Sequence, residues 1–120
     1  MKKIDQKKKS AATWFKFLRD KICSELEIIE ENNSKQTPKF KKKKWLRDKT
    51  NKKDLGGGEM SLLRGKVFEK AGVNISTVYG NFSEKLKGKI PGTEKNASYK
   101  ATGISVVLHP FSPHIPSMHF

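Results

Sequence analysis

The chain has 120 residues, with 26 lysines and arginines against 12 acidic residues, which gives a net charge of +14. This length supports one domain and excludes a multidomain enzyme within these residues. A hydrophobic share of 34% allows a modest core and is not the composition of a fully disordered chain. The aliphatic stretch at residues 104–108 is far shorter than the roughly 20 apolar residues of a membrane span. The sequence shows no secretory signal and its single Cys23 cannot form an internal disulfide, so we expect a cytoplasmic location.

The positive charge is concentrated in the first half of the chain. Residues 1–53 hold 18 of the 26 basic residues and 7 of the 12 acidic ones. Such a surface attracts nucleic acid, acidic lipid or a polycarboxylate substrate. The lysine run 41–44, flanked by Phe40 and Trp45, would suit a contact that tracks a nucleic-acid backbone. Since no nucleic-acid-binding motif accompanies the run, a solvated connector is the simpler interpretation.

The first predicted element is an amphipathic helix. We expect residues 1–9 to form a disordered basic tail and Ser10 to cap the helix, which then runs to about Glu31. One apolar stripe follows from the three- and four-residue spacing of Ala11, Trp14, Phe15, Leu18, Ile22, Leu26 and Ile29. Cys23 lies beside this stripe, which favours a small buried side chain over a reactive thiol.

The rest of the chain reads as antiparallel strands, so the predicted fold class is α+β. Residues 32–55 form a lysine-rich loop or an extended edge segment. Strands are predicted at residues 60–68, 73–79 and 101–109, with an extended segment at residues 117–120. The first two strands would pair around residues 70–72. Prolines 110, 113 and 116 predict a stiff connection before the final segment.

The three histidines form the candidate site, because they fall within eleven residues of one another. Ser105 and His109 share one strand face about 13 Å apart. If the prolines fold the chain into a hairpin, His119 returns beside His109, and the two imidazoles could share a proton, a substrate carboxylate or a divalent metal. Two ligands make a weak metal site, and a structural pair is the plainer alternative. His114 is expected to be exposed at the apex of the loop.

Four motifs occur in a fixed order along the chain. They are Trp14-Phe15-x-x-Leu18-Arg19-Asp20, Gly56-Gly57-Gly58-x-Met60-Ser61, Arg64-Gly65-x-Val67-Phe68-Glu69-Lys70 and His109-Pro110-x-x-Pro113-x-x-Pro116-x-x-His119. Together they resemble the N-terminal part of the oxygen-dependent coproporphyrinogen III oxidases. Residues 10–120 would then be the N-terminal portion of a single oxidase domain that is truncated here.

The resemblance implies a large flat antiparallel sheet flanked by helices, in an enzyme that acts as a homodimer. It also implies oxidative decarboxylation of coproporphyrinogen III to protoporphyrinogen IX in haem biosynthesis. Molecular oxygen would be the co-substrate, without an organic cofactor or a nucleic-acid partner.

Residue by residue, the resemblance implies that Ser105 contacts the substrate, that His109 is a metal ligand, and that His119 is a proton donor and metal ligand. The two histidines can equally serve as hydrogen-bonding partners. The family's Asn-x-Arg substrate element would follow Phe120, so we expect the 120 residues alone to be inactive. The alternative function is a non-catalytic basic module that binds nucleic acid or acidic lipid through residues 39–53.

Overall fold

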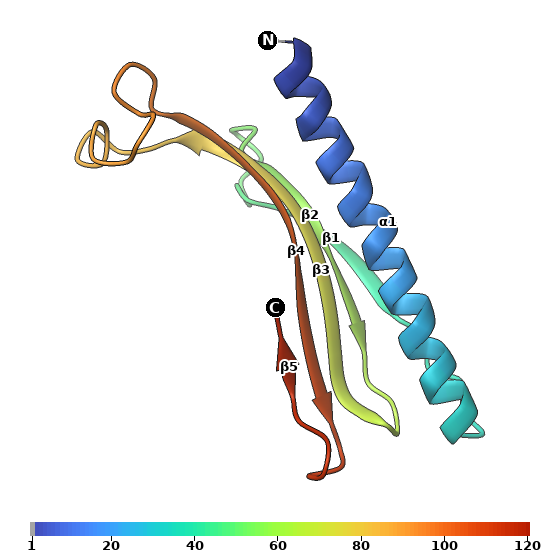
Figure 1. Cartoon of the computed structure of the whole chain (residues 1–120). Coiled ribbons are helices and arrows are strands. Elements are labelled where there is room, and N and C mark those ends of the chain that lie inside the picture. The colour runs from blue at the N-terminus through green and yellow to red at the C-terminus, as the bar shows by residue number, and fades with distance from the viewer. Residues whose placement is uncertain (1) are drawn as a thin grey trace.

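The computed structural model describes residues 2–120, which form one helix packed on one face of an antiparallel sheet (Figure 1). The strands follow one another in the sheet in the order β1-β2-β3-β4-β5. The elements are α1 (Lys2–Asn33), β1 (Lys41–Leu46), β2 (Gly56–Leu63), β3 (Phe68–Asn81), β4 (Ser98–Pro110) and β5 (Met118–His119). The predicted α+β class is confirmed. Within residues 2–120, no helix is both long and apolar enough to cross a membrane.

Helix α1 begins at Lys2, well before the predicted start at Ser10. The expectation of a disordered tail is therefore wrong for residues 2–9, while Met1 lies outside the described residues. Lysine is a good helix former, and Asp5 in the first turn complements the helix dipole. The Lys8 ammonium also lies 3.5 Å from the Asp5 carboxylate. The helix propensity of lysine and the interactions of Asp5 therefore stabilise helix at residues 2–9, where the high lysine content had suggested fraying.

The packed face of α1 is rotated relative to the predicted apolar stripe. Cys23 and Leu26 are buried as expected, but Trp14 is 54% exposed and Ile29 is 40% exposed. Two charged side chains are buried on this face instead, Arg19 and Glu30. Both find partners on the strands or on the turn between them, which offsets the cost of removing their charges from water.

The sheet has one covered face and one open face. Leu63, Ala71, Val73 and Val106 point toward α1 and form the buried core with Cys23 and Leu26. Because side chains alternate along a strand, the neighbours of these residues point to the other side. No element of residues 2–120 covers that side in Figure 1. We call it the open face.

Two local predictions about the strands need correction. The β2–β3 turn occupies residues 64–67 and not residues 70–72, because the Glu30 carboxylate accepts hydrogen bonds from the backbone at this earlier position. Residues 41–46 form edge strand β1, so the edge alternative is right for this part of the lysine-rich segment. Lysines are common on sheet edges because their charge opposes edge-to-edge pairing with other chains.

Cys23 provides a test of the packing between α1 and the sheet. The side chain is 4% exposed, and burial raises the pKa of its thiol to about 11. An ordinary thiol with a pKa near 8.5 is half ionised at pH 8.5, so we expect iodoacetamide to label the folded protein about 100-fold more slowly than the urea-unfolded protein. Mass spectrometry measures both rates. Equal rates would contradict the burial of Cys23.

Candidate functional site

The central feature of the open face is a pair of histidines from adjacent strands. His109 lies near the end of β4 and His119 lies on β5. Their Nε2 atoms are 2.7 Å apart, and the ring centroids are separated by 5.0 Å. The predicted hairpin therefore brings the two imidazoles into direct contact.

Backbone pairing fixes the direction of His119. Val106 and Phe120 exchange two backbone hydrogen bonds, of 2.7 and 3.0 Å. Val107 is consequently the partner of His119 in the register between β4 and β5. Since Val106 is buried toward α1, Val107 and its partner His119 belong to the open face.

Ser105 belongs to the same face as the histidine pair. It stands two and four residues before Val107 and His109 on β4, so the three side chains share one side of the strand. Ser105 is exposed and pairs with Asn74 of β3. His114 is exposed in the turn before β5 and takes no part in the pair. The structure thus places Ser105, His109 and His119 on one face.

The imidazole contact defines what the pair can do. In a hydrogen bond between two ring nitrogens, one nitrogen donates and the other accepts, so the pair holds one proton between them. Such an arrangement can deliver or receive a proton from a bound molecule.

The same residues fit a metal centre poorly. Two nitrogens bound to one tetrahedral ion at about 2.0–2.1 Å would be roughly 3.3 Å apart. The 2.7 Å separation is instead a hydrogen-bond distance. Among residues 2–120, no group of three or more histidine, cysteine, aspartate or glutamate side chains could hold a metal ion. The donor set described here supports a hydrogen-bonded pair.

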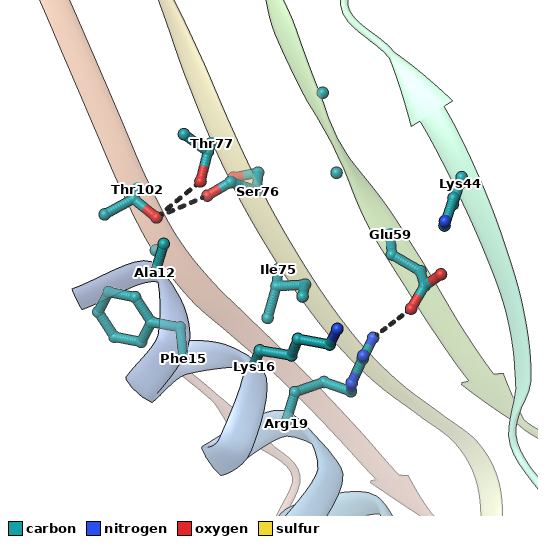
Figure 2. A pocket seen from close by; sticks show the side chains of 13 residues that line it. Ala12, Phe15, Lys16, Arg19, Lys44, Glu59, Ile75, Ser76, Thr77 and Thr102 are labelled. Carbon is teal, nitrogen blue, oxygen red and sulfur yellow. Dashed lines mark hydrogen bonds and ion pairs between the residues drawn. The ribbon is translucent and has the colours of Figure 1, made fainter. Parts of the chain in front are cut away.

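On the opposite face, the structure contains a cleft between α1 and the sheet that the sequence analysis missed (Figure 2). Arg19 lies at its inner wall, only 2% exposed, with Nε 2.6 Å from Asp20 and Nη1 2.7 Å from Glu59. Burial alone would raise the pKa of Asp20, but the hydrogen bond and charge of Arg19 lower it below its ordinary value. The sequence did contain one signal for this cleft. Arg19 follows Phe15 by four residues, so the two side chains lie on the same, packed side of the helix.

An imidazole pair beside a serine hydroxyl on an open sheet face can donate hydrogen bonds to a carboxylate and can transfer a proton. Residues 10–120 match the model of the coproporphyrinogen III oxidase family, and the chain belongs to this family.

Three curated relatives are oxygen-dependent coproporphyrinogen-III oxidases from species of Rickettsia. The chain is 50% identical to the Rickettsia felis protein over 115 residues, which are 96% of this chain and 41% of that protein. It is 49% identical to the Rickettsia akari protein with the same coverage. Identity to the Rickettsia bellii protein is 50% over 113 residues, which are 91% of this chain and 39% of the relative. The chain spans about two fifths of the length of these relatives.

Proposed function

We propose that this chain supplies the N-terminal part of an enzyme that converts coproporphyrinogen III to protoporphyrinogen IX with molecular oxygen. The observation that carries the proposal is the presence of Ser105, His109 and His119 on one open sheet face, within a segment that matches the oxidase family. The whole enzyme would use no organic cofactor and would act as a homodimer, as the resemblance implies. The single free and buried Cys23 supports a reducing, cytoplasmic location.

In this reaction the protein must supply and remove protons at defined positions, and it needs no strong acid or base. Two of the four propionates each lose carbon dioxide and a hydride equivalent from the β-carbon and become vinyl groups. Oxygen takes up the two electrons and two protons and leaves as hydrogen peroxide. The electron-rich pyrrole of the substrate assists the departure of the hydride, so the protein's task is to position and protonate.

The side chains of the open face suit these tasks. The Ser105 hydroxyl can donate a hydrogen bond to a substrate carboxylate. His119 can pass a proton to the reduced oxygen. His109 shares this proton through the hydrogen bond between the two rings and orients the His119 ring. The positive charge of the chain favours a substrate with several carboxylates.

The proposal predicts that the 120 residues alone are inactive, while a longer chimera that contains them is active. In the chimera, residues 10–120 replace the matching segment of the Rickettsia felis protein. The isolated chain leaves the open face to water, so it cannot enclose a macrocycle or shield the reacting atoms. Porphyrin fluorescence of the oxidised product measures turnover. Activity from the isolated chain would refute the first expectation, and a folded but inactive chimera would refute the function.

The alternative, a nucleic-acid or lipid surface at residues 39–53, has less support. Strand β1 divides its lysines between the two faces of the sheet, since Lys42 is the partner of buried Ser61 and Lys43 is the partner of Met60. Lys39 lies 3.4 Å from the Glu27 carboxylate, and Lys42 lies 3.5 Å from that of Asp20. The run therefore does not form one uninterrupted cationic surface.

A further inference from the structure

The cleft between α1 and the sheet has the size of a small-molecule site. Figure 1 shows the sheet bending away from the N-terminal half of α1, and the cleft lies in the region between them. Its volume is about 360 Å³, within the range of about 300–1,000 Å³ that is usual for ligand pockets. It lies on the covered side of the sheet, whereas Ser105 and the histidine pair lie on the open face. Nothing in the proposed oxidase reaction uses it.

One end of the cleft carries an excess of positive charge. Lys16, Arg19 and Lys44 line it together with one carboxylate, that of Glu59 (Figure 2). Lys16 and Lys44 form no ion pair with any of residues 2–120, whereas Arg19 binds Glu59. Arg19 is bound by Asp20 as well as by Glu59, so three cations and two carboxylates leave an excess of one positive charge.

Arg19 also retains a free donor. Its hydrogen bonds use Nε and Nη1, and no residue of the described chain 2–120 accepts from Nη2. No side-chain nitrogen or oxygen in this part of the chain is both fully buried and without a partner, so Nη2 is not completely buried. Since Arg19 is otherwise buried and lines the cleft, the cleft is where this group can meet an acceptor.

The other end of the cleft is apolar. Ala12 and Phe15 line it from α1, at the side away from the charged groups in Figure 2. Thr77 and Thr102 face them, with their hydroxyl oxygens 2.9 Å apart, and the Thr102 hydroxyl donates to the Ser76 carbonyl at 3.1 Å. The Thr102 hydrogen is thus used within the sheet, and the Thr77 hydroxyl donates to Thr102. This end offers carbon atoms and no free hydroxyl hydrogen.

We infer that this cleft binds a small carboxylate with an apolar body about the size of one aromatic ring. The carboxylate would lie at the end formed by Lys16, Arg19 and Lys44, where charge-assisted hydrogen bonds are available. The apolar body would pack on Phe15 and Ala12. Inorganic phosphate satisfies only the first end and a neutral ring satisfies only the second, so both features select an amphiphilic anion.

Titration with benzoate, followed by backbone amide shifts of the 120-residue protein, tests this inference. Saturable shifts are expected at Ala12, Phe15 and Thr102. Benzamide lacks the charge and acetate lacks the ring, so each should bind at least about tenfold more weakly than benzoate. Absence of saturable shifts, or equal binding of benzamide, would overturn the inference.

Charge-matched variants separate a specific site from general attraction to a basic protein. Lys16→Gln and Lys44→Gln should each weaken benzoate binding by about threefold to fivefold, as expected for partly solvated charge contacts. Lys21→Gln removes the same charge from α1 outside the cleft, where Lys21 lies 3.1 Å from Glu25. It should leave the affinity unchanged. An equal loss in Lys21→Gln would show that the attraction is nonspecific and would reject the site.

Discussion

Replacing Glu30 with alanine is expected to lower the free energy of unfolding by about 3–5 kcal/mol. The Glu30 side chain is fully buried, and its carboxylate accepts backbone N–H hydrogen bonds from Lys66, Val67 and Phe68 at 2.9, 3.0 and 2.8 Å. Truncation would leave these three donors without a partner and open a cavity between α1 and the β2–β3 turn. Domains of this size have a total stability of about 5–15 kcal/mol, so the loss would be a large share of it.

Urea unfolding followed by circular dichroism measures this change. Glu31→Ala alters the exposed neighbour on the same helix and should change stability by less than about 0.5 kcal/mol. Glu30→Gln keeps the shape and one acceptor oxygen, so its loss should be intermediate. Gly65→Ala should also destabilise the fold, because its Cβ would overlap the Glu30 carboxylate. A loss below about 1 kcal/mol for Glu30→Ala would show that the turn does not depend on the carboxylate.

In the chimera with the Rickettsia felis protein, His119→Ala is expected to reduce kcat by at least about 100-fold. The imidazole lies on the open face at 2.7 Å from His109, where it can transfer a proton to a bound molecule. Alanine removes that group but leaves the backbone pairing of β5 with β4, because that pairing uses main-chain atoms. The loss should therefore appear in kcat more than in KM.

His114→Ala is the matched control, since His114 is an exposed histidine in the neighbouring turn, and it should retain activity within about twofold. If the two imidazoles act as a unit, the double variant of His109 and His119 should lose little more than the worse single variant. Additive losses would indicate separate roles. A His119→Ala chimera with more than about a third of normal activity would exclude proton transfer by this residue.

The histidine pair could be predicted because its cause is local. His109 and His119 are ten residues apart, and the prolines between them favour a reversal of the chain. The strand at residues 73–79 was likewise visible as an alternation, and the observed β3 contains it entirely. Periodicity also placed most of α1, because Ile22 and Leu26, both members of the predicted stripe, pack in or against the core.

The missed features depend on contacts between distant parts of the chain. Arg19 and Glu59 are 40 residues apart, and Glu30 and Phe68 are 38 residues apart. Helical periodicity alone predicts that such charged residues are exposed to solvent, because the sequence does not show which residues of the sheet will pair with them. The same long-range packing moved the face of α1 away from Trp14, which is half exposed.

The glycine triplet shows a similar limit. Glycine adopts backbone angles that other residues avoid, and Gly56, at the start of β2, has a positive φ of 81°. The close approaches at the next two positions were not visible in the sequence. A Cβ on Gly57 would overlap the Trp45 carbonyl, and one on Gly58 would overlap the Ile75 carbonyl and crowd the Trp45 ring. These neighbours belong to β1 and β3, so only the assembled sheet explains the glycines.

The alternation along β4 places adjacent residues under different physical constraints. Ile104 and Val106 are constrained by packing against α1, whereas Ser105 and His109 are constrained by contacts with a molecule bound at the open face. Substitutions that preserve side-chain volume should be tolerated at the residues that face α1. At the residues of the open face, only substitutions that preserve the chemical groups should be tolerated. Among descendants of this gene, tolerated variation along β4 should therefore alternate in character from each residue to the next.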